Sequence, residues 1–381
     1  MLTQEENDLL ARVDPGTPCG ELLRRYWQPV VSAGELTSEH PKKRVRILGE
    51  DLVLYRDPDG GYGLIAEHCA HRGCSLYYGF LEDGGIRCAY HGWLYDRAGK
   101  CLEQPFEPAE SMMKYAVRQP AYPVERLAGL LFAYLGPQPA PLLPRWDHLV
   151  RDGGRRRLEV HPIIDCNWLQ CQENSIDPVH THYLHAHTFW SRGLPGGEYH
   201  HRPIEKFEFE MTEWGIFKRR TFGGDQPEQE VGHLALFPNM LRHPASLHWR
   251  VPIDDTHTQI FQMLWRPSTD PATPPEEGDP PVDYITVKNE QGEFHMENFP
   301  SQDEMAWETQ GQLADRTRER LGASDRGIAM WRQLLKEQIE AVHRGDDPIA
   351  LVRDPAKNEI VWFETSSATR RDEYAEALRN G

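Results

Sequence analysis

The pattern of hydrophobic and polar positions in the first part of the chain follows the short period of β-strands. A short helical pattern covers residues 4–12 and ends at Asp14-Pro15-Gly16. From there to residue 135, runs of β-branched and aromatic residues alternate with Gly- and Asp-rich turns; the runs lie at 45–48, 52–55, 62–65 and 130–134. This alternation predicts an antiparallel, all-β unit.

A proline-rich segment marks a boundary after this unit. Residues 136–144 contain four prolines, and such a stretch continues neither a sheet nor a helix. Beyond it, the pattern predicts one helix over 168–184, strands between 204 and 265, and two further helices, over 302–321 and from an N-cap at Ser324 to about 342. Helices and strands thus segregate, which predicts an α+β fold. We expect a helical segment (1–26), an all-β domain (27–138) and an α+β domain with an antiparallel sheet and flanking helices (139–381).

Composition excludes several classes of function. Lys and Arg number 42 against 59 Asp and Glu, a net charge of −17, and no basic block is concentrated enough for a nucleic-acid partner. Apolar stretches such as 127–135 are much shorter than the roughly 20 residues of a membrane helix, and the mean hydropathy is −0.66. The acidic N-terminus lacks a secretion signal, so we expect a cytoplasmic protein. Seven cysteines in a reducing compartment then favour metal ligands or nucleophiles over disulfides.

Two pairs of cysteine and histidine form the first candidate site. Cys69 and His71 are followed, after sixteen residues, by Cys88 and His91, each pair where a turn leaves a strand. A zinc ion could take all four, but common zinc modules use halves of one ligand type, whereas each half here mixes thiolate and imidazole. That mixture suits a Rieske [2Fe-2S] cluster, in which one iron takes both sulfurs and the other both imidazoles. The sequence favours the cluster and keeps zinc as an alternative.

The remaining cysteines have no matching partners. Cys74 lies where respiratory Rieske proteins carry a disulfide cysteine, but the position of its partner is Tyr90. We therefore interpret Cys74 as structural and the others as buried small side chains: Cys19, Cys101, Cys166 and Cys171.

A carboxylate and two imidazoles form the second candidate site. Asp177, His180 and His185 are spaced Asp-x-x-His-x₄-His, and because five residues exceed one helical turn, the helix should loosen near Tyr183. Two imidazoles and one carboxylate on one side of an iron are the ligands of iron(II) oxygenases. The carboxylate could come from Asp177, which could instead orient His180, or from Asp303.

Two ambiguities remain in this site. Asp303 could simply cap the helix that it opens. His182 and His187 repeat the spacing of His180 and His185, but residue 179, three positions before His182, is a valine rather than an acid.

The motifs resemble those of the α subunits of Rieske non-haem iron oxygenases. The resemblance is strongest to the phthalate-dioxygenase-like and vanillate-demethylase-like branch, which uses one subunit type. It covers nearly the whole chain, and the segments that carry it are 27–30, 69–73, 88–93, 167–185 and 302–335.

The resemblance implies a set of ligands and an assembly. It implies iron bound by His180, His185 and Asp303, with Asp315 as the fallback for the third ligand, and Asn174 near the iron. It also implies a homotrimer, or a multiple of it, in which Asp177 lies at the subunit junction and hydrogen-bonds the neighbour's counterpart of His91. Electrons would then cross from one chain's cluster to the next chain's iron.

The function that follows is the terminal oxygenase of an aromatic catabolic system. No Gly-rich dinucleotide fingerprint or flavin motif is present, so electrons from NAD(P)H must come through a separate reductase or ferredoxin. By resemblance the substrates are O₂ and an aromatic carboxylate or ether, with dihydroxylation, monohydroxylation or O-dealkylation as the outcome. Arg219, Arg220 and Arg242 are candidate carboxylate clamps. The alternatives are a Rieske-type electron carrier without oxygenase chemistry and a zinc protein.

Overall fold

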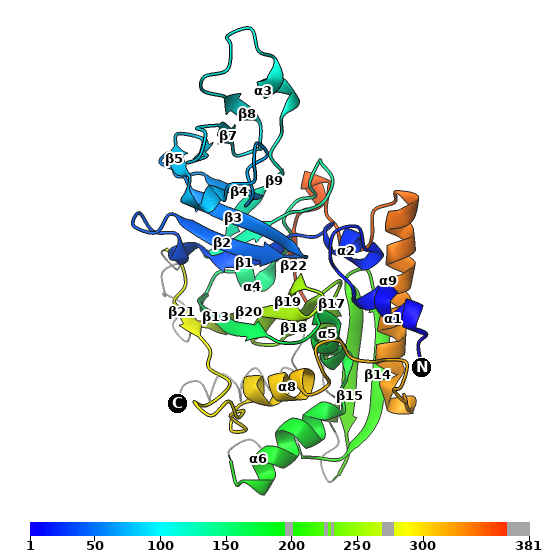
Figure 1. Ribbon diagram of the computed structural model, residues 1–381. Helices are drawn as coiled ribbons and strands as arrows, with labels where there is room; N and C mark the ends of the chain where they lie inside the picture. Colours follow the sequence, from blue (N-terminus) through cyan, green and yellow to red (C-terminus); the bar gives the residue numbers. More distant parts are fainter. Residues whose placement is uncertain (195–200, 225–227, 230–231, 269–277, 364–381) are drawn as a thin grey trace.

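The computed structural model describes residues 1–194, 201–224, 228–229, 232–268 and 278–363. The N-terminal β region contains three small antiparallel sheets, stacked in the upper half of Figure 1. Their strand orders are β1-β11-β10, β2-β3-β4-β9 and β5-β6-β7-β8. The bounds are β1 (Gln28–Ser32), β2 (Lys42–Ile47), β3 (Glu50–Arg56), β4 (Tyr62–Ala66), β5 (Phe80–Glu82), β6 (Gly85–Arg87), β7 (Leu94–Asp96), β8 (Cys101–Glu103), β9 (Ala121–Tyr122), β10 (Val124–Leu127) and β11 (Leu130–Ala133).

The second half is built on a nine-stranded sheet of order β14-β15-β17-β18-β19-β20-β13-β21, with β16 paired to β15. Its pairs are antiparallel except β13 with β21. The bounds are β13 (Gly154–Ile164), β14 (Ile204–Thr212), β15 (Gly215–Phe222), β16 (Glu228–Gln229), β17 (His233–Leu236), β18 (Met240–His243), β19 (Ser246–Asp254), β20 (His257–Pro267) and β21 (Val282–Tyr284). Two short strands, β12 (Arg145–Trp146) and β22 (Ile360–Val361), form a separate parallel pair.

Helices flank the large sheet. In Figure 1, α8 lies below β18 to β20, α5 lies between these strands and β15, α6 lies at the lower end of the molecule, and the long α9 runs beside β14 and β15. The helices are α1 (Gln4–Ala11), α2 (Pro18–Leu23), α3 (Met113–Ala116), α4 (Asp147–Val150), α5 (Trp168–Ile176), α6 (Thr188–Ser191), α8 (Phe299–Glu308) and α9 (Arg326–Arg344). The α+β prediction, with an all-β region first, is confirmed. No helix in the described ranges combines the length and the apolar character needed to cross a lipid bilayer.

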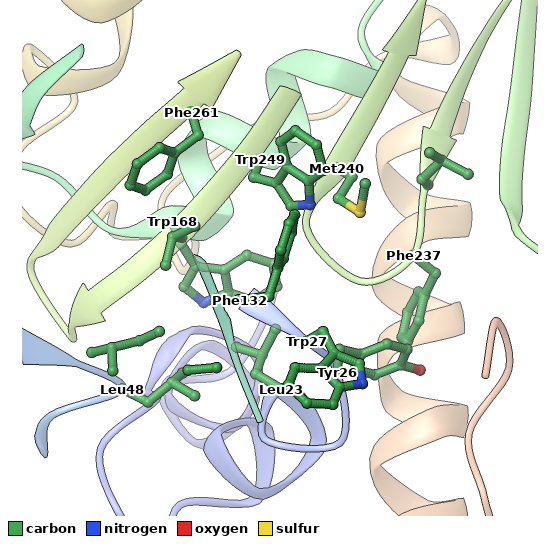
Figure 2. Packing of buried hydrophobic residues seen from close by; sticks show 14 of the residues in the cluster. Leu23, Tyr26, Trp27, Leu48, Phe132, Trp168, Phe237, Met240, Trp249 and Phe261 are labelled. Atoms are coloured by element: carbon green, nitrogen blue, oxygen red, sulfur yellow. The ribbon is translucent and has the colours of Figure 1, made fainter. Parts of the chain in front are cut away.

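One hydrophobic core runs from the β region into the second half of the chain. Phe132 of β11 packs edge-on against Trp249 of β19, with ring centroids 5.8 Å apart, and Trp27 and Trp168 belong to the same buried cluster (Figure 2). The N-terminal segment joins the second half as well, because Asn167 and Trp168 both donate hydrogen bonds to the carbonyl of Ala11. The domain division at residue 138 remains a prediction.

Three predicted helix limits are wrong. The helix expected over 168–184 ends at Ile176, because Asp177 adopts an extended conformation before Pro178. The helix expected over 302–321 begins earlier, at the N-cap Asn298, and ends at Glu308, before Gly311 with its left-handed φ of 93°. The helix expected to start from a Ser324 cap instead starts after Asp325, while Ser324 lies inside a short 3₁₀ turn (Ala323–Asp325). These differences arise because the limits of a helix depend on capping and turn geometry, which hydrophobic periodicity does not contain.

Candidate metal centres

The two loops that carry the Cys and His pairs have the same backbone form. In each, the residue four positions after the cysteine donates its N–H to the cysteine carbonyl, and the cysteine N–H is bonded to the carbonyl five positions on. The residue at the first of these positions is a glycine with left-handed φ, Gly73 at 72° and Gly92 at 73°. The repeated turn presents Cys69 and Cys88 in matching fashion from two neighbouring loops.

The side chains of these two loops lie close together. Both cysteines are buried, whereas the rings of His71 and His91 are partly exposed with centroids 4.6 Å apart. The ring of Trp93 stacks on His71 at 4.3 Å. The Nδ1 atom of His71 is buried and has no hydrogen-bond partner, as expected of an atom that is left for a metal.

The chemistry of the four side chains fits a sulfide-bridged pair of irons. Burial raises the pKa of the Cys69 thiol, and the nearby Cys88 raises it further, so that paired thiolates need cations beside them. Among the described residues, three ligand atoms lie within 4.8 Å of one another at His180, His185 and Asp303, whereas no three of the Cys and His ligands of these loops come that close. The spread of these four ligands therefore favours a binuclear cluster over one tetrahedral zinc ion.

The second site begins where α5 ends. Asp177, the C-cap of α5, adopts an extended conformation because Pro178 follows it. The chain then enters a π-helical segment, Thr181–His187. A π-helix bonds residue i to residue i+5, so it brings two side chains five positions apart onto one side. The predicted loosening near Tyr183 takes this form, and His180 and His185 have ring centroids 5.2 Å apart.

Helix α8 supplies a carboxylate to the two imidazoles. Asp303 Oδ1 lies 3.3 Å from His185 Nε2 and 3.9 Å from His180 Nε2. All three residues offer ligand atoms within 4.8 Å of one another. Metal bonds of about 2.1 Å place neighbouring ligands roughly 3 Å apart, so this arrangement fits a single metal ion with little adjustment.

Charges in the second site favour a cation between the three side chains. Burial alone would raise the pKa of Asp303, but His185 and then His180 lower it below its ordinary value, so the group is a carboxylate. Burial lowers the pKa of His180 despite the nearby Asp177, which favours the neutral imidazole that a metal requires.

Neighbouring polar groups fix the orientation of this set. The Nδ1–H of His185 donates to Gln302 Oε1 at 2.8 Å, and the amide of the fully buried Gln302 donates in turn to the carbonyl of Met296. The sequence reasoning missed Gln302, and its only signal was its position directly before Asp303. An orienting partner of this kind is typical of metal-bound histidines.

Two further predicted residues lie beside the ligands. Asn174 Nδ2 donates to Asp303 Oδ1 at 3.3 Å. A carboxylate oxygen of Asp177 lies 3.5 Å from His180 Nδ1, and the other accepts from the backbone N–H of Val179 at 2.7 Å. Asp177 is thus directed at the far side of the His180 ring from Asp303.

The alternative ligands do not join this group. Asp315 is exposed and accepts hydrogen bonds from Thr317. His182 and His187 face His201 instead: His182 stacks on it with centroids 5.0 Å apart, and His187 Nδ1 lies 3.1 Å from its Nε2.

The three candidate clamps have protein partners. The buried Arg242 binds both carboxylate oxygens of Asp147, at 3.0 and 2.7 Å. Arg219 pairs with Glu210 at 2.8 Å, and Arg220 hydrogen-bonds the hydroxyl of Thr181 at the start of the π-helix. Arg220 thus contacts the segment that carries the two histidines.

Two protein families match the chain. Residues 26–123 match the Rieske [2Fe-2S] domain, and residues 286–371 match the family described as LigXa C-terminal domain like.

Solved structures with the same fold include the oxygenase NdmA of Pseudomonas putida CBB5, with a TM-score of 0.61, 20% identity and coverage of 89% of this chain and 99% of NdmA. Another is the oxygenase of carbazole 1,9a-dioxygenase in complex with its ferredoxin, with a TM-score of 0.59, 21% identity and coverage of 86% and 95%. At these identities the likeness shows the fold alone.

Curated relatives align over almost the full length. The 5,5'-dehydrodivanillate O-demethylase oxygenase subunit of Sphingobium sp. strain SYK-6 is 42% identical, covering 96% of this chain and 87% of the relative. The phenoxybenzoate dioxygenase subunit alpha of Ectopseudomonas oleovorans is 38% identical, with coverage of 94% and 92%. The phthalate 4,5-dioxygenase oxygenase subunit of Pseudomonas putida is 33% identical, with coverage of 96% and 92%. The chain therefore belongs to the family of Rieske oxygenase α subunits, the terminal oxygenases of multicomponent systems.

Proposed function

We propose that this terminal oxygenase receives electrons at a cluster held by Cys69, His71, Cys88 and His91 and oxidises an aromatic substrate at an iron held by His180, His185 and Asp303. The observation that carries the proposal is the convergence of two imidazoles and one carboxylate within 4.8 Å, in a chain whose other half is a Rieske domain. An electron carrier would have no use for this second set of ligands.

The protein's own groups prepare the second site for O₂ chemistry. A ferrous ion there would supply the activation of O₂, while the cluster would supply electrons one at a time. Gln302 fixes the plane of the His185 ring, and Asn174 donates to the ligand oxygen of Asp303. His180, His185 and Asp303 would hold the ion with three protein ligands, and the remaining ligand positions would be available to O₂.

We propose a ring of three chains, or a multiple of it, as the working assembly. In Figure 1, the strands β5 and β7, which are next to the cluster loops in the chain, lie in the upper part of the molecule and α8 lies in the lower part, so a neighbour is better placed to receive the electron. In this assembly, His91 of one chain donates a hydrogen bond to the exposed side of Asp177 in the next. Large exposed residues of the β region, such as Tyr78, Phe80 and Tyr90, support a protein contact near the cluster.

The substrate class follows from the relatives. Dehydrodivanillate, phenoxybenzoate and phthalate, which appear in the relatives' names, are aromatic carboxylates, and two of them also carry ether groups. We propose an aromatic carboxylate or ether, with ring dihydroxylation, monohydroxylation or O-dealkylation as the reaction. NAD(P)H would act through a separate reductase or ferredoxin.

Metal analysis and turnover test the proposal together. An oxygenase should contain about three irons and two acid-labile sulfides per chain, an electron carrier about two of each, and a zinc protein neither. With a surrogate reductase, aromatic acids and ethers should stimulate NADH and O₂ consumption and yield an oxygenated product. Two irons per chain in fully loaded protein, without any oxygenated product, would reject the oxygenase.

A further inference from the structure

One side of the large sheet faces the candidate iron ligands. Residues directly opposite one another in an antiparallel pair share a side, so the registers β15–β17, β17–β18, β18–β19 and β19–β20 assign residues to this side. Three of its members are buried cations, Lys218, Arg220 and Arg250. Lys218 reaches the carbonyl of Asp177 at 3.1 Å. The opposite side carries Trp249, which packs in the core shared with the β region (Figure 2).

Arg250 points from β19 toward α5 and α8. Ile260, which is directly opposite it in the sheet, packs in a small cluster with Cys171 of α5 and Trp307 of α8. Cys171 and Asp303 are also the groups whose charges act on the Arg250 guanidinium. The side chain therefore ends between the sheet, α5 and α8, the helix that carries the ligand Asp303.

Two nitrogens of the Arg250 guanidinium are buried without a hydrogen-bond partner. The residue is only 3% exposed, and within the described part of the chain its Nε and Nη1 have no acceptor. Burial lowers its pKa only to about 10, so it stays charged at neutral pH. The charge of Asp303 acts on the guanidinium, but among the described residues no hydrogen bond joins the two side chains, and Asp303 Oδ1 is directed at Asn174 and the two histidines.

An unpartnered buried cation is unfavourable in the empty site and becomes favourable when an anion binds. Leaving charged donors buried without acceptors costs free energy, which a carboxylate recovers by accepting two parallel hydrogen bonds from the guanidinium fork. The nearby His248 does not compete with Arg250 for an anion, because burial lowers the pKa of His248 well below its ordinary value and keeps it neutral. A cationic side chain near the metal ligands thus selects for a negatively charged substrate.

We propose that Arg250 binds the carboxylate of the aromatic substrate and so holds the ring beside the iron ligands. This assignment rests on the proposed oxygenase function and makes it narrower, because it restricts the substrate to aromatic acids. It replaces Arg242 and Arg219 as the clamp, since both of those have carboxylate partners within the chain.

Binding measurements on iron-loaded protein without reductase test the assignment. The probes are phthalate, 3-chlorobenzoate, phenoxybenzoate and 5,5'-dehydrodivanillate, each compared with its methyl ester by titration calorimetry. Wild-type protein should bind at least one acid much more tightly than its ester. In Arg250→Gln, the Kd of that acid should rise about 10- to 100-fold while that of the ester changes little. Arg250→Lys keeps the positive charge but not the two parallel donors, so its Kd for the acid should lie between those of wild-type protein and Arg250→Gln.

The control is Arg219→Gln, which removes a partly exposed guanidinium that pairs with Glu210 and should leave acid binding unchanged. Equal weakening of acid and ester, or loss of iron from Arg250→Gln, would overturn the assignment and make Arg250 a support for Asp303. If the variant does not fold, wild-type protein that binds esters as tightly as acids, or binds none of the acids, still rejects it. Arg250-dependent binding of an acid without any oxidation would instead reject the proposed oxygenase function.

Discussion

The two candidate metal centres are built in different ways. Each half of the cluster site is a closed turn of a few residues, with its own backbone hydrogen bonds and its own left-handed glycine. The three-residue site instead joins a π-helical segment to a separate helix, α8, from a distant part of the chain. The geometry of the cluster site is set by short local segments, whereas the three-residue site forms only after the whole second half of the chain has folded.

Because the two sites are built in different ways, a change in one site should leave the other intact. The cluster loops depend on local turns, so changes in α8 should leave them intact. The ligand set of His180, His185 and Asp303 depends on packing and on orienting groups such as Gln302. The following changes test that division, beginning with the largest expected effect.

Replacing Asp303 by Ala should abolish turnover and leave the cluster untouched. The change removes the carboxylate from the set that meets within 4.8 Å, so two imidazoles alone should retain little iron. Iron should fall from about three to about two per chain, with acid-labile sulfide and the visible spectrum of the cluster unchanged.

Asp315→Asn is the matched control for the Asp303 variant. Asp315 is an exposed aspartate that binds only within its own turn, so its variant should keep wild-type iron and activity. If Asp315→Asn lost the third iron and Asp303→Ala kept it, the ligand assignment would be wrong.

Asp177→Asn tests the link between the two centres. The variant keeps the shape of the side chain but removes the charge beside His180. Metal content should stay near the wild-type value, while reoxidation of the reduced cluster by O₂ and substrate, followed by stopped-flow absorbance, should slow by about 100-fold. Asp177→Glu, which restores the charge, should recover part of the rate. Wild-type reoxidation in Asp177→Asn would contradict the proposed electron route.

Gln302→Leu should weaken metal binding without removing a ligand. It takes away the acceptor for His185 Nδ1–H, and such orienting partners contribute about 10- to 100-fold in metal affinity. Titration of the iron-free second site with Co²⁺ should report the change as a higher Kd. Gln302→Glu keeps an acceptor and should bind nearly normally, and Gln310→Leu, at an exposed position beyond α8, is the control. Unchanged Co²⁺ affinity in Gln302→Leu would show that His185 is held by packing alone.

The same contrast explains how far the sequence could predict the fold. Strands such as 52–55 and 62–65 have local patterns, and the structure contains them within β3 and β4. The helix predicted over 302–321 ends at Glu308 in the structure, before Gly311 with its left-handed φ. Helix ends depend on capping geometry that periodicity does not contain.

The sites follow the same rule. The spacing of Cys69, His71, Cys88 and His91 holds nearly all the information about the cluster loops, because each half is local. For the second site, spacing indicated His180 and His185, but the choice among Asp177, Asp303 and Asp315 depended on which helix lies opposite them. Arg250 and Gln302 could not be found from local pattern, since their roles arise from burial and from contacts between distant segments.

Tyr95→Phe should give the smallest effect, and that effect should be confined to the cluster site. The buried Tyr95 hydroxyl lies 3.3 Å from Cys69 Sγ, and a hydrogen bond to a cluster sulfur stabilises the reduced, more negative state. If that bond contributes about 1 kcal/mol, its loss should lower the midpoint potential by about 40 mV, measurable by redox titration of the visible spectrum. Co²⁺ affinity of the second site should stay unchanged, because no described contact joins Tyr95 to its ligands. An unchanged potential would mean that the hydroxyl does not donate to the sulfur, and a weakened second site would contradict the independence of the two centres.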